Sequence, residues 1–167
     1  MEPRPRGVSG RGLALLAVVV VAFVVATTFA VIKHNDMSNA SSKTHERTHV
    51  AALAGQFAID FTSVDYRHME SDFAAAAKNA TPDFAKKYLA TVKVFEPLYT
   101  KGQVVQTTAV EKTAVSSITS DSAVVLVALS GSATNVKTQS STPQLFRMQI
   151  SLSLVNGDWL TSNVVPL

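Results

Sequence analysis

The feature that most constrains this chain is an uninterrupted apolar segment near its start. From Leu13 to Ile32 the sequence reads LALLAVVVVAFVVATTFAVI, with no charged residue in 20 positions. At about 1.5 Å per residue, a helix of this length spans about 30 Å, the thickness of the hydrocarbon core of a bilayer. A small domain cannot bury such a helix on all sides, so the segment predicts a transmembrane helix.

A cleavable signal peptide is the alternative interpretation of this segment. The apolar core of a signal peptide covers about 7–15 residues and is followed by a small-x-small cleavage site. The segment here is longer, and it ends in Val31-Ile32-Lys33, which does not resemble a cleavage site. We therefore expect an anchor that stays in the mature protein.

The charges beside the segment predict its orientation. Arg4, Arg6 and Arg11 precede it, whereas the residues that follow Ile32 are nearly balanced in charge. By the positive-inside rule, the N-terminus lies in the cytoplasm and the C-terminal part lies outside it, in a single-pass protein of the cell membrane. The predicted order is a basic cytoplasmic tail (1–12), a transmembrane helix (13–32), a polar tether (33–44) and one extracytoplasmic domain (45–167).

The composition of the part that follows the anchor narrows the classes of partner. Without the three arginines and Glu2 of the tail, 12 Lys and Arg remain against 11 Asp and Glu. The alkaline pI of about 9.3 therefore comes largely from the tail and does not indicate binding to nucleic acid. The chain has no cysteine, so an exported domain must be stabilised by its core and not by disulfides.

The pattern within the domain changes from helices to strands near Gly102. Apolar residues at spacings of three and four predict helices over residues 45–66, 71–78 and 81–102, with Pro97 and Gly102 ending the third. Val- and Thr-rich or alternating runs predict strands over residues 104–118, 122–129, 145–155 and 159–165, with a polar loop over 130–143. The pair Asn156-Gly157 is typical of a two-residue hairpin turn between the last two strands.

Strands joined in series by hairpins pair antiparallel, and a sheet with one apolar face needs a cover. The sequence therefore predicts an α+β domain of about three helices on a four-stranded antiparallel sheet, with the first helix as the cover. Trp159 could anchor a partner protein, but a core position on the last strand is the more usual role. The predicted core residues are Phe57, Phe61, Phe84, Tyr88, Ile150, Leu152 and Trp159.

Residues His45 to His49 read HERTH, which matches the H-E-x-x-H zinc motif. The match lies in the first turn of a helix, beside a polar tether. It contains Arg47 at a position that is normally uncharged in zinc-binding helices, because those helices are buried. A zinc site also needs a third ligand, and Glu70 is the nearest plausible candidate. We therefore expect a solvated helix turn and no metal site.

Four polar residues near the end of the first helix are candidates for lining a pocket between helix and sheet: Asp60, Asp65, Tyr66 and His68. An Asp–His pair in such a pocket could carry acid–base chemistry. No nucleophile elbow or phosphate-binding loop accompanies them in the sequence, so we expect no catalytic residue and no cofactor.

The layout as a whole resembles the Mce-associated membrane proteins of actinobacteria, which accompany the mammalian-cell-entry (Mce) lipid importers. The resemblance lies in the Arg-rich tail, the Val/Ala-rich anchor, FAIDFTSVDY at 57–66, ESD at 70–72, TPDFAKKY at 81–88 and GDWL at 157–160. The HERTH sequence is not part of the family pattern. The layout is also similar to the periplasmic domain of the type IV secretion inner-membrane scaffold protein.

This resemblance implies the cone-like α+β fold of the nuclear transport factor 2 and scytalone dehydratase superfamily, also called SnoaL-like. It further implies a non-enzymatic accessory subunit that assembles or stabilises an Mce-type importer of sterols or fatty acids. The implied partners are the membrane, Mce complex subunits or other membrane-anchored proteins, and lipid. Two alternatives remain open: a small pocket enzyme of the dehydratase or isomerase type, and a type IV secretion scaffold-like protein.

Overall fold

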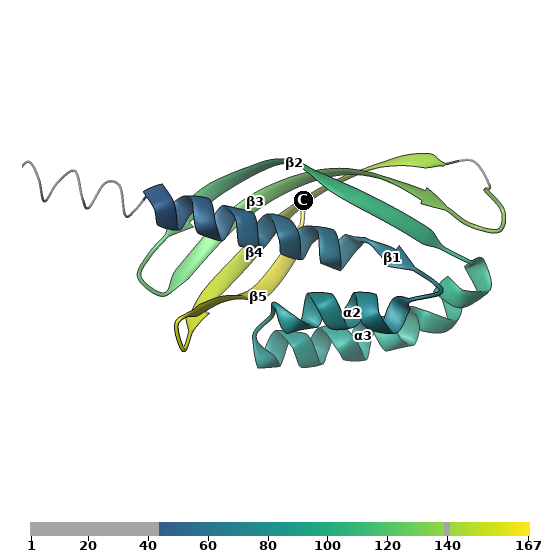
Figure 1. Cartoon of the computed structure of the whole chain (residues 1–167), viewed down its shortest axis with the longest axis horizontal. Helices are drawn as coiled ribbons and strands as arrows, with labels where there is room; N and C mark the ends of the chain where they lie inside the picture. The colour runs from purple at the N-terminus through teal and green to yellow at the C-terminus, as the bar shows by residue number, and fades with distance from the viewer. Residues whose placement is uncertain (1–43, 139–140) are drawn as a thin grey trace, which may run out of the picture. The chain divides into compact units, whose positions relative to one another are not determined.

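The computed structural model of this chain describes residues 44–138 and 141–167 (Figure 1). The predicted cytoplasmic tail, the transmembrane helix at 13–32 and nearly all of the tether lie outside the described residues. Within the described ranges, no helix is both long and apolar enough to cross a membrane. The chain separates into two units between residues 45 and 46, and all of the described strands lie in the second unit.

Three helices precede most of the strands. The first helix covers residues 44–62 of the described chain, followed by α2 (Met69–Lys78) and α3 (Pro82–Gly102). As the sequence predicts, α3 begins at a cap: the backbone N–H of Phe84 donates to the Thr81 hydroxyl over 3.4 Å, and Pro82 occupies the first turn.

The prediction that Pro97 takes part in ending α3 is wrong, because Pro97 lies inside the helix. A proline removes one backbone hydrogen bond from a helix. The residues that follow Pro97 still form the hydrogen bonds of the last turn, so the helix continues past it. The backbone N–H groups of Gln103 and Val104 donate to the carbonyl groups of Thr100 and Tyr99, at 3.1 Å each. Gln103 adopts a left-handed conformation at this cap, so α3 ends at Gly102.

The first helix ends about one turn earlier than predicted, and a fifth strand follows it. The chain leaves the helix after Thr62, whose hydroxyl donates to the carbonyl of Ala58 over 2.7 Å. Val64–Asp65 then forms the short strand β1, which pairs with Val105 and Gln106. The prediction of four strands is corrected to five, because two residues are too few to show an alternating pattern in the sequence.

The sheet is antiparallel throughout, with its five strands in the order β1-β2-β3-β4-β5. The other four strands are β2 (Val105–Ile118), β3 (Ser122–Thr134), β4 (Thr142–Val155) and β5 (Asp158–Pro166). Half of the predicted loop over 130–143 is therefore strand, namely residues 130–134 and 142–143. Gly131 permits this extension, because a Cβ atom there would clash with the Thr107 carbonyl oxygen of β2.

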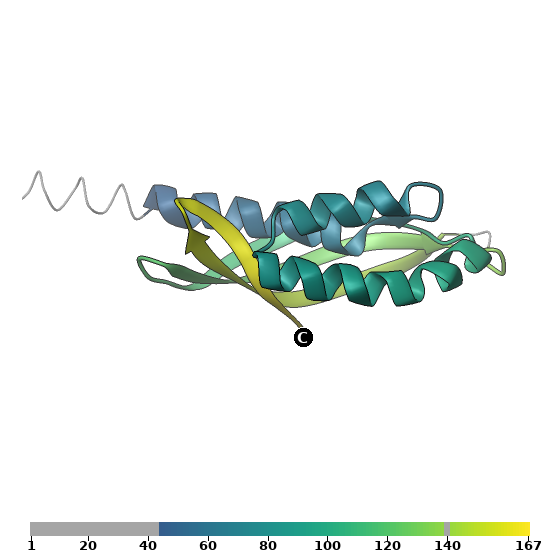
Figure 2. The same ribbon diagram turned by 90° about the horizontal axis from the view of Figure 1, so that it is seen from below.

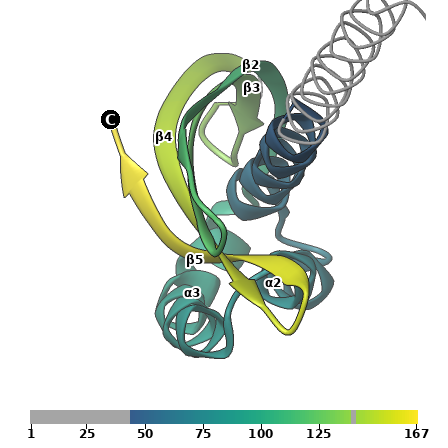
Figure 3. The same ribbon diagram turned by 90° about the vertical axis from the view of Figure 1, so that its left-hand side faces the viewer.

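Register shifts bend the sheet. β2 is shifted against β3 between Val110 and Lys112 and again between Val115 and Ser117. β4 is shifted against β5 between Ser151 and Leu152. Such bulges increase the local twist, and Figure 3 shows the strands curving beside the helices. Beyond Gln106, the outer edge of β2 pairs with no other described strand.

The core lies between the curved sheet and the three helices, and Figure 2 shows α2 and α3 running side by side on the side that faces the viewer. Phe57 of the first helix is 1% exposed, and it belongs to one cluster with Ile150 and Leu152 of β4, which are 0% and 1% exposed. The first helix therefore covers the apolar face of the sheet, as its stripe of apolar residues predicts. The other fully buried large side chains are Val50, Val125, Leu129 and Thr161.

Candidate functional site

Five aromatic rings from three helices meet beside the sheet, with Tyr88 of α3 at their centre. The Tyr88 ring lies 5.2 Å from Phe61, 6.2 Å from Phe73 and 6.4 Å from Phe84, measured between ring centroids. Phe57 lies 5.7 Å from Phe61 and 6.1 Å from Phe84. These contacts are in the range of favourable aromatic pairs, so the cluster fixes the first helix, α2 and α3 to one another.

A cavity of about 390 Å³ lies between this aromatic cluster and the sheet. We call it the cone cavity. Most of its lining side chains are apolar or aromatic, and they come from all three helices, from β1, β2 and β4, and from the C-terminal end. The lining residues are Phe61, Thr62, Val64, Phe73, Tyr88, Val92, Tyr99, Gln106, Leu145, Phe146, Arg147, Met148, Pro166 and Leu167.

The polar groups of the residues that line the cone cavity differ in whether they have hydrogen-bond partners. The Gln106 amide nitrogen donates to the Thr62 carbonyl over 2.5 Å, and the Thr62 hydroxyl donates to Ala58. The hydroxyl of Tyr88, a residue only 8% exposed, is the one buried side-chain polar atom without a hydrogen-bond partner among the described residues. Burial raises the pKa of Tyr88 above its ordinary value, with smaller contributions from Tyr99, Asp60 and Asp72.

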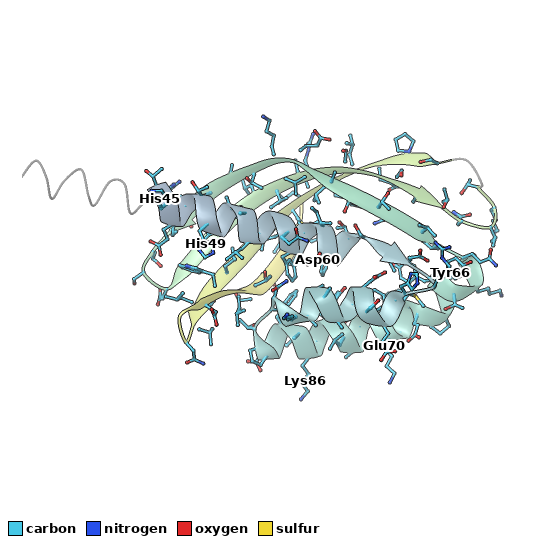
Figure 4. The ribbon with its side chains drawn as sticks, viewed as in Figure 1. His45, His49, Asp60, Tyr66, Glu70 and Lys86 are labelled. Carbon is cyan, nitrogen blue, oxygen red and sulfur yellow. The ribbon has the colours of Figure 1, made fainter. Side chains whose placement is uncertain are left out.

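None of the four polar residues that the sequence suggests for the pocket lines the cone cavity. Asp60 lies on the first helix (Figure 4) and accepts a hydrogen bond of 2.8 Å from the Gln56 amide one turn earlier. Asp65, Tyr66 and His68 lie between the end of the first helix and α2. Tyr66 and His68 line a separate surface hollow of about 580 Å³, whose other lining residues are Arg67, Met69, Glu70, Ser71, Ala74 and Glu96.

The side-chain hydrogen bonds of the Asp65 carboxylate go to Arg67. The Arg67 guanidinium donates to Asp65 Oδ2 over 2.5 Å and to Oδ1 over 2.9 Å. These bonds hold the pKa of Asp65 at about 2, and the Arg67 pKa is raised in return. His68 Nδ1 is 3.9 Å from Asp65 Oδ2, which is too far for a hydrogen bond. An Asp–His pair for acid–base chemistry is therefore not formed here.

The HERTH sequence lies in the first turns of the first helix, where His45, Glu46 and His49 are all exposed (Figure 4). The Arg47 guanidinium donates to the Val115 carbonyl of β2 over 2.9 Å, which ties this end of the helix to the sheet. Across residues 44–138 and 141–167, no group of three His, Cys, Asp or Glu side chains could hold a metal ion.

One surface of α3 carries exposed apolar side chains, including Phe95, which the helical spacing predicts on the apolar face with Phe84, Tyr88 and Val92. Val94 is 74% exposed, Phe95 is 48% exposed and Leu98 is 67% exposed. We call these three residues the α3 row. The helical repeat groups Phe95 with the inward-facing Tyr88 and Val92, so the sequence alone suggests that Phe95 is covered.

The other predicted core residues lie at different depths. Tyr88 and Trp159 are each 8% exposed, and Trp159 lies at the start of β5, opposite Leu154. Phe61 and Phe84 are half-buried and pack against the core cluster. The seven residues thus all belong to or adjoin a single cluster.

The family described as "Uncharacterized protein Rv1363c/MT1408-like" matches residues 11–166 of this chain. A relative from Mycobacterium tuberculosis (strain ATCC 25618 / H37Rv), "Uncharacterized protein Rv1363c", is 26% identical over 152 residues. That match covers 91% of this chain but only 57% of the relative, so the chain spans little more than half the length of the relative.

Several similar solved structures come from secretion and conjugation systems. An IcmL-like type IV secretion system protein of Legionella pneumophila superposes with a TM-score of 0.59 at 11% identity, over 72% of this chain and 93% of that one. The periplasmic domain of DotI gives 0.57 at 12%, over 71% and 92%. CagV of Helicobacter pylori, a VirB8 homologue, gives 0.56 at 6%, over 70% and 95%.

The resemblance to the nuclear transport factor 2 fold is also supported. An "Ntf2 like protein involved in plasmid conjugation" superposes with a TM-score of 0.51 at 11% identity, over 72% of this chain and 48% of that one. At such low identities these similarities concern the fold: an α+β domain of three helices and a five-stranded antiparallel sheet.

Proposed function

Because the chain belongs to the Rv1363c/MT1408-like family, we propose that it is a membrane-anchored accessory subunit that assembles or stabilises a protein complex and catalyses no reaction itself. The domain shares its fold with the periplasmic domains of type IV secretion proteins, which supports an interaction role outside the cytoplasm. The apolar segment at 13–32 would provide the anchor.

The observation that carries this proposal is the α3 row. Val94 and Leu98 are one helical turn apart and Phe95 lies between them, so the three side chains form one continuous apolar strip. The strip lies on the side of α3 away from α2, because Leu89, Lys93 and Glu96 line the groove that α3 forms with α2. Exposed apolar strips of this kind mark surfaces where another protein binds.

The short length of the tether favours a partner protein that is itself bound to the membrane. Twelve residues between the anchor and the domain, treated as a flexible coil, span roughly 20 Å. The domain would therefore stay close to the bilayer surface, where its local concentration for other anchored proteins is high. A weak interface such as the α3 row suffices under these conditions.

We propose that the complex is an Mce-type importer of sterols or fatty acids. The support is the resemblance of the tail, anchor and domain motifs to Mce-associated membrane proteins, together with a relative in Mycobacterium tuberculosis. The second candidate is a subunit of a type IV secretion-like assembly, and the structural similarity to IcmL-like and DotI domains favours it. The two candidates differ in the proteins that bind the domain.

The test measures membrane subunits of both kinds of complex by quantitative mass spectrometry in cells that lack the gene. Loss of the protein should lower the abundance of Mce subunits, and a copy of the wild-type gene should restore it. A Leu98→Glu copy should not restore it, because a charge is then placed within the α3 row. Ala75→Glu is the matched control, since Ala75 is exposed on α2, and the row lies on the side of α3 away from α2.

Each outcome separates one part of the proposal from another. A fall in secretion-type subunits, with Mce subunits unchanged, would favour the second candidate. Full restoration by a stably folded Leu98→Glu protein would show that the α3 row is not the binding surface. Unchanged abundance of all subunits without the gene would contradict an assembly role altogether.

A further inference from the structure

Two exposed lysines flank the α3 row and indicate what kind of partner it fits. Lys87 precedes Val94 by two helical turns, and Lys101 follows Leu98 by about one turn, so both lie on the side of α3 that carries the row. Building on the assembly role proposed above, we propose that the α3 row and these two lysines bind an amphipathic helix of the partner protein, whose apolar stripe lies between two acidic residues.

The charges of the two lysines are not neutralised by the domain itself. Within residues 44–138 and 141–167, neither Lys87 nor Lys101 forms an ion pair. Asp83 lies one turn before Lys87 on the same helix, but no ion pair joins the two. Acidic residues of a partner would supply the missing counter-charges. The surface would then have an apolar centre and a charged rim, which is the usual division of a protein–protein interface.

The spacing of the lysines determines the size of the partner segment. At about 1.5 Å per residue, the Cα atoms of Lys87 and Lys101 are about 21 Å apart along α3. A helix that runs along α3 would therefore need acidic residues nearly four turns apart. An extended segment fits less well, because its own backbone groups would be left unpaired against Val94 and Leu98. Helices instead pack through rows of side chains.

The same charges disfavour two other occupants of this surface. In a pair of α3 helices from two copies of the chain, Lys87 would face a lysine of the other copy in either a parallel or an antiparallel arrangement, and like charges repel. Helices that lie on anionic lipid are rich in Lys and Arg over their polar face. The exposed part of α3 also carries Asp83 and Glu96, which such a lipid surface would repel.

The first experiment detects the contacts directly, in native membranes of cells that make the full chain. A zero-length carbodiimide joins a lysine amine to a carboxylate only where the two are in contact, and mass spectrometry identifies the joined peptides. Lys87 and Lys101 should both be joined to Asp or Glu residues on one segment of one other protein. Lys78, exposed on α2, should not be joined to that segment. Joining to a second copy of this chain, or to no other protein, would overturn the proposal.

The second experiment uses the cells without the gene that are described above, and measures the subunit identified by cross-linking. A Lys87→Glu/Lys101→Glu copy should leave the abundance of this subunit at about the level found without the gene, whereas Lys87→Arg/Lys101→Arg should restore it. Lys78→Glu/Lys112→Glu makes the same change in net charge at exposed positions on α2 and β2 and should also restore it. Cross-linking of the wild type remains decisive should the first variant fail to accumulate.

The outcomes separate this proposal from the assembly role on which it rests. Restoration by a stably accumulated Lys87→Glu/Lys101→Glu protein, with none by Leu98→Glu, would overturn the acidic partner helix and leave the assembly role intact. Unchanged abundance of all subunits without the gene would instead overturn the assembly role, and the proposal with it.

Discussion

The rings of Phe61 and Tyr88 lie 5.2 Å apart at an interplanar angle of 32°, joining the first helix to α3. Phe61 is half-buried and lines the cone cavity, whereas Phe57, one turn earlier, is 1% exposed and lies in the core. The two phenylalanines on the apolar stripe of the first helix therefore have different surroundings. Replacing each with alanine should change the stability of the protein by different amounts.

Phe57→Ala should lower the free energy of unfolding by about 3–5 kcal/mol, because it leaves a void in a closed core. Phe61→Ala should have a smaller effect, since its ring already borders open space. Denaturant unfolding of the two variants measures the difference, with Val94→Ala as an exposed control that should change stability by less than about 0.5 kcal/mol. Equal losses at Phe57 and Phe61 would contradict the cavity beside Phe61.

Tyr88→Phe should respond to alkaline pH differently from the wild type. The Tyr88 pKa is raised in the folded state above the ordinary value of 10.0, so the stabilisation of the neutral phenol is complete below about pH 10 and is lost as the pH rises further. Above pH 10 the wild type should therefore lose stability relative to Tyr88→Phe. Parallel unfolding curves of the two proteins from pH 8 to pH 11, measured by circular dichroism, would contradict a buried hydroxyl.

The stability of the protein at acid pH should depend on the contact between Asp65 and Arg67. Its pKa is lowered from 3.8 to about 2, so the contribution of the carboxylate to stability is present above about pH 4 and is lost as the pH falls towards 2. The melting temperature of the wild type should exceed that of Asp65→Asn slightly at pH 7 and equal it near pH 2. Asp83, an exposed residue in the first turn of α3, provides the control substitution Asp83→Asn. An NMR titration of Asp65 with an unshifted midpoint would disprove the contact.

Two glycines should respond to alanine in opposite directions. Gly131→Ala should destabilise the protein, because the new Cβ atom meets the Thr107 carbonyl oxygen and the Thr108 side chain in β2. Gly55 is inside the first helix, and a Cβ atom there would meet Val110 Cγ2 at 3.4 Å, an ordinary contact. Gly55→Ala should therefore stabilise by up to about 1 kcal/mol through helix propensity. Thermal unfolding of both variants gives the signs directly, and a stabilising Gly131→Ala would contradict the extended pairing of β3.

The orientation of the chain can be tested with fused reporters. A reporter that is active only outside the cytoplasm should be active when it is fused after Leu167. Replacing Arg4, Arg6 and Arg11 with glutamine should weaken the preference, because those charges predict the orientation. Activity of a cytoplasm-only reporter at the same position would reverse the predicted topology.

Local patterns predicted the elements that depend on local spacing. The stripe through Phe57 and Phe61, the cap at Thr81-Pro82 and the turn at Asn156-Gly157 each involve residues that are close in sequence, and the structure contains all three. β1 could not be predicted, because it exists only through its pairing with Val105 and Gln106 some 40 residues later. The same applies to the extension of β3 through Ser130 and Thr134, whose polar residues read as a loop.

The four candidate pocket residues lie outside the cone cavity for a related reason. Had the first helix continued to Tyr66, Asp65 would have followed Phe61 by one turn and faced the same side. Because the helix ends after Thr62, β1 and the turn that follows it determine where the side chains of Asp65, Tyr66 and His68 point, and the helical repeat does not. Tyr88 was predicted as a core residue, but the lack of a partner for its hydroxyl depends on contacts among three helices that the sequence does not encode locally.

The bulged outer edge of β2 has a consequence for how copies of the domain can meet. An open strand edge invites aggregation by β-pairing between copies of a protein. Along this edge the register shift between Val110 and Lys112 interrupts the row of backbone donors and acceptors that a second copy would need. Arg47 and Ser63 also occupy two of these backbone groups, the Val115 carbonyl and the Thr108 N–H. The edge is therefore a poor template for a strand from a second copy.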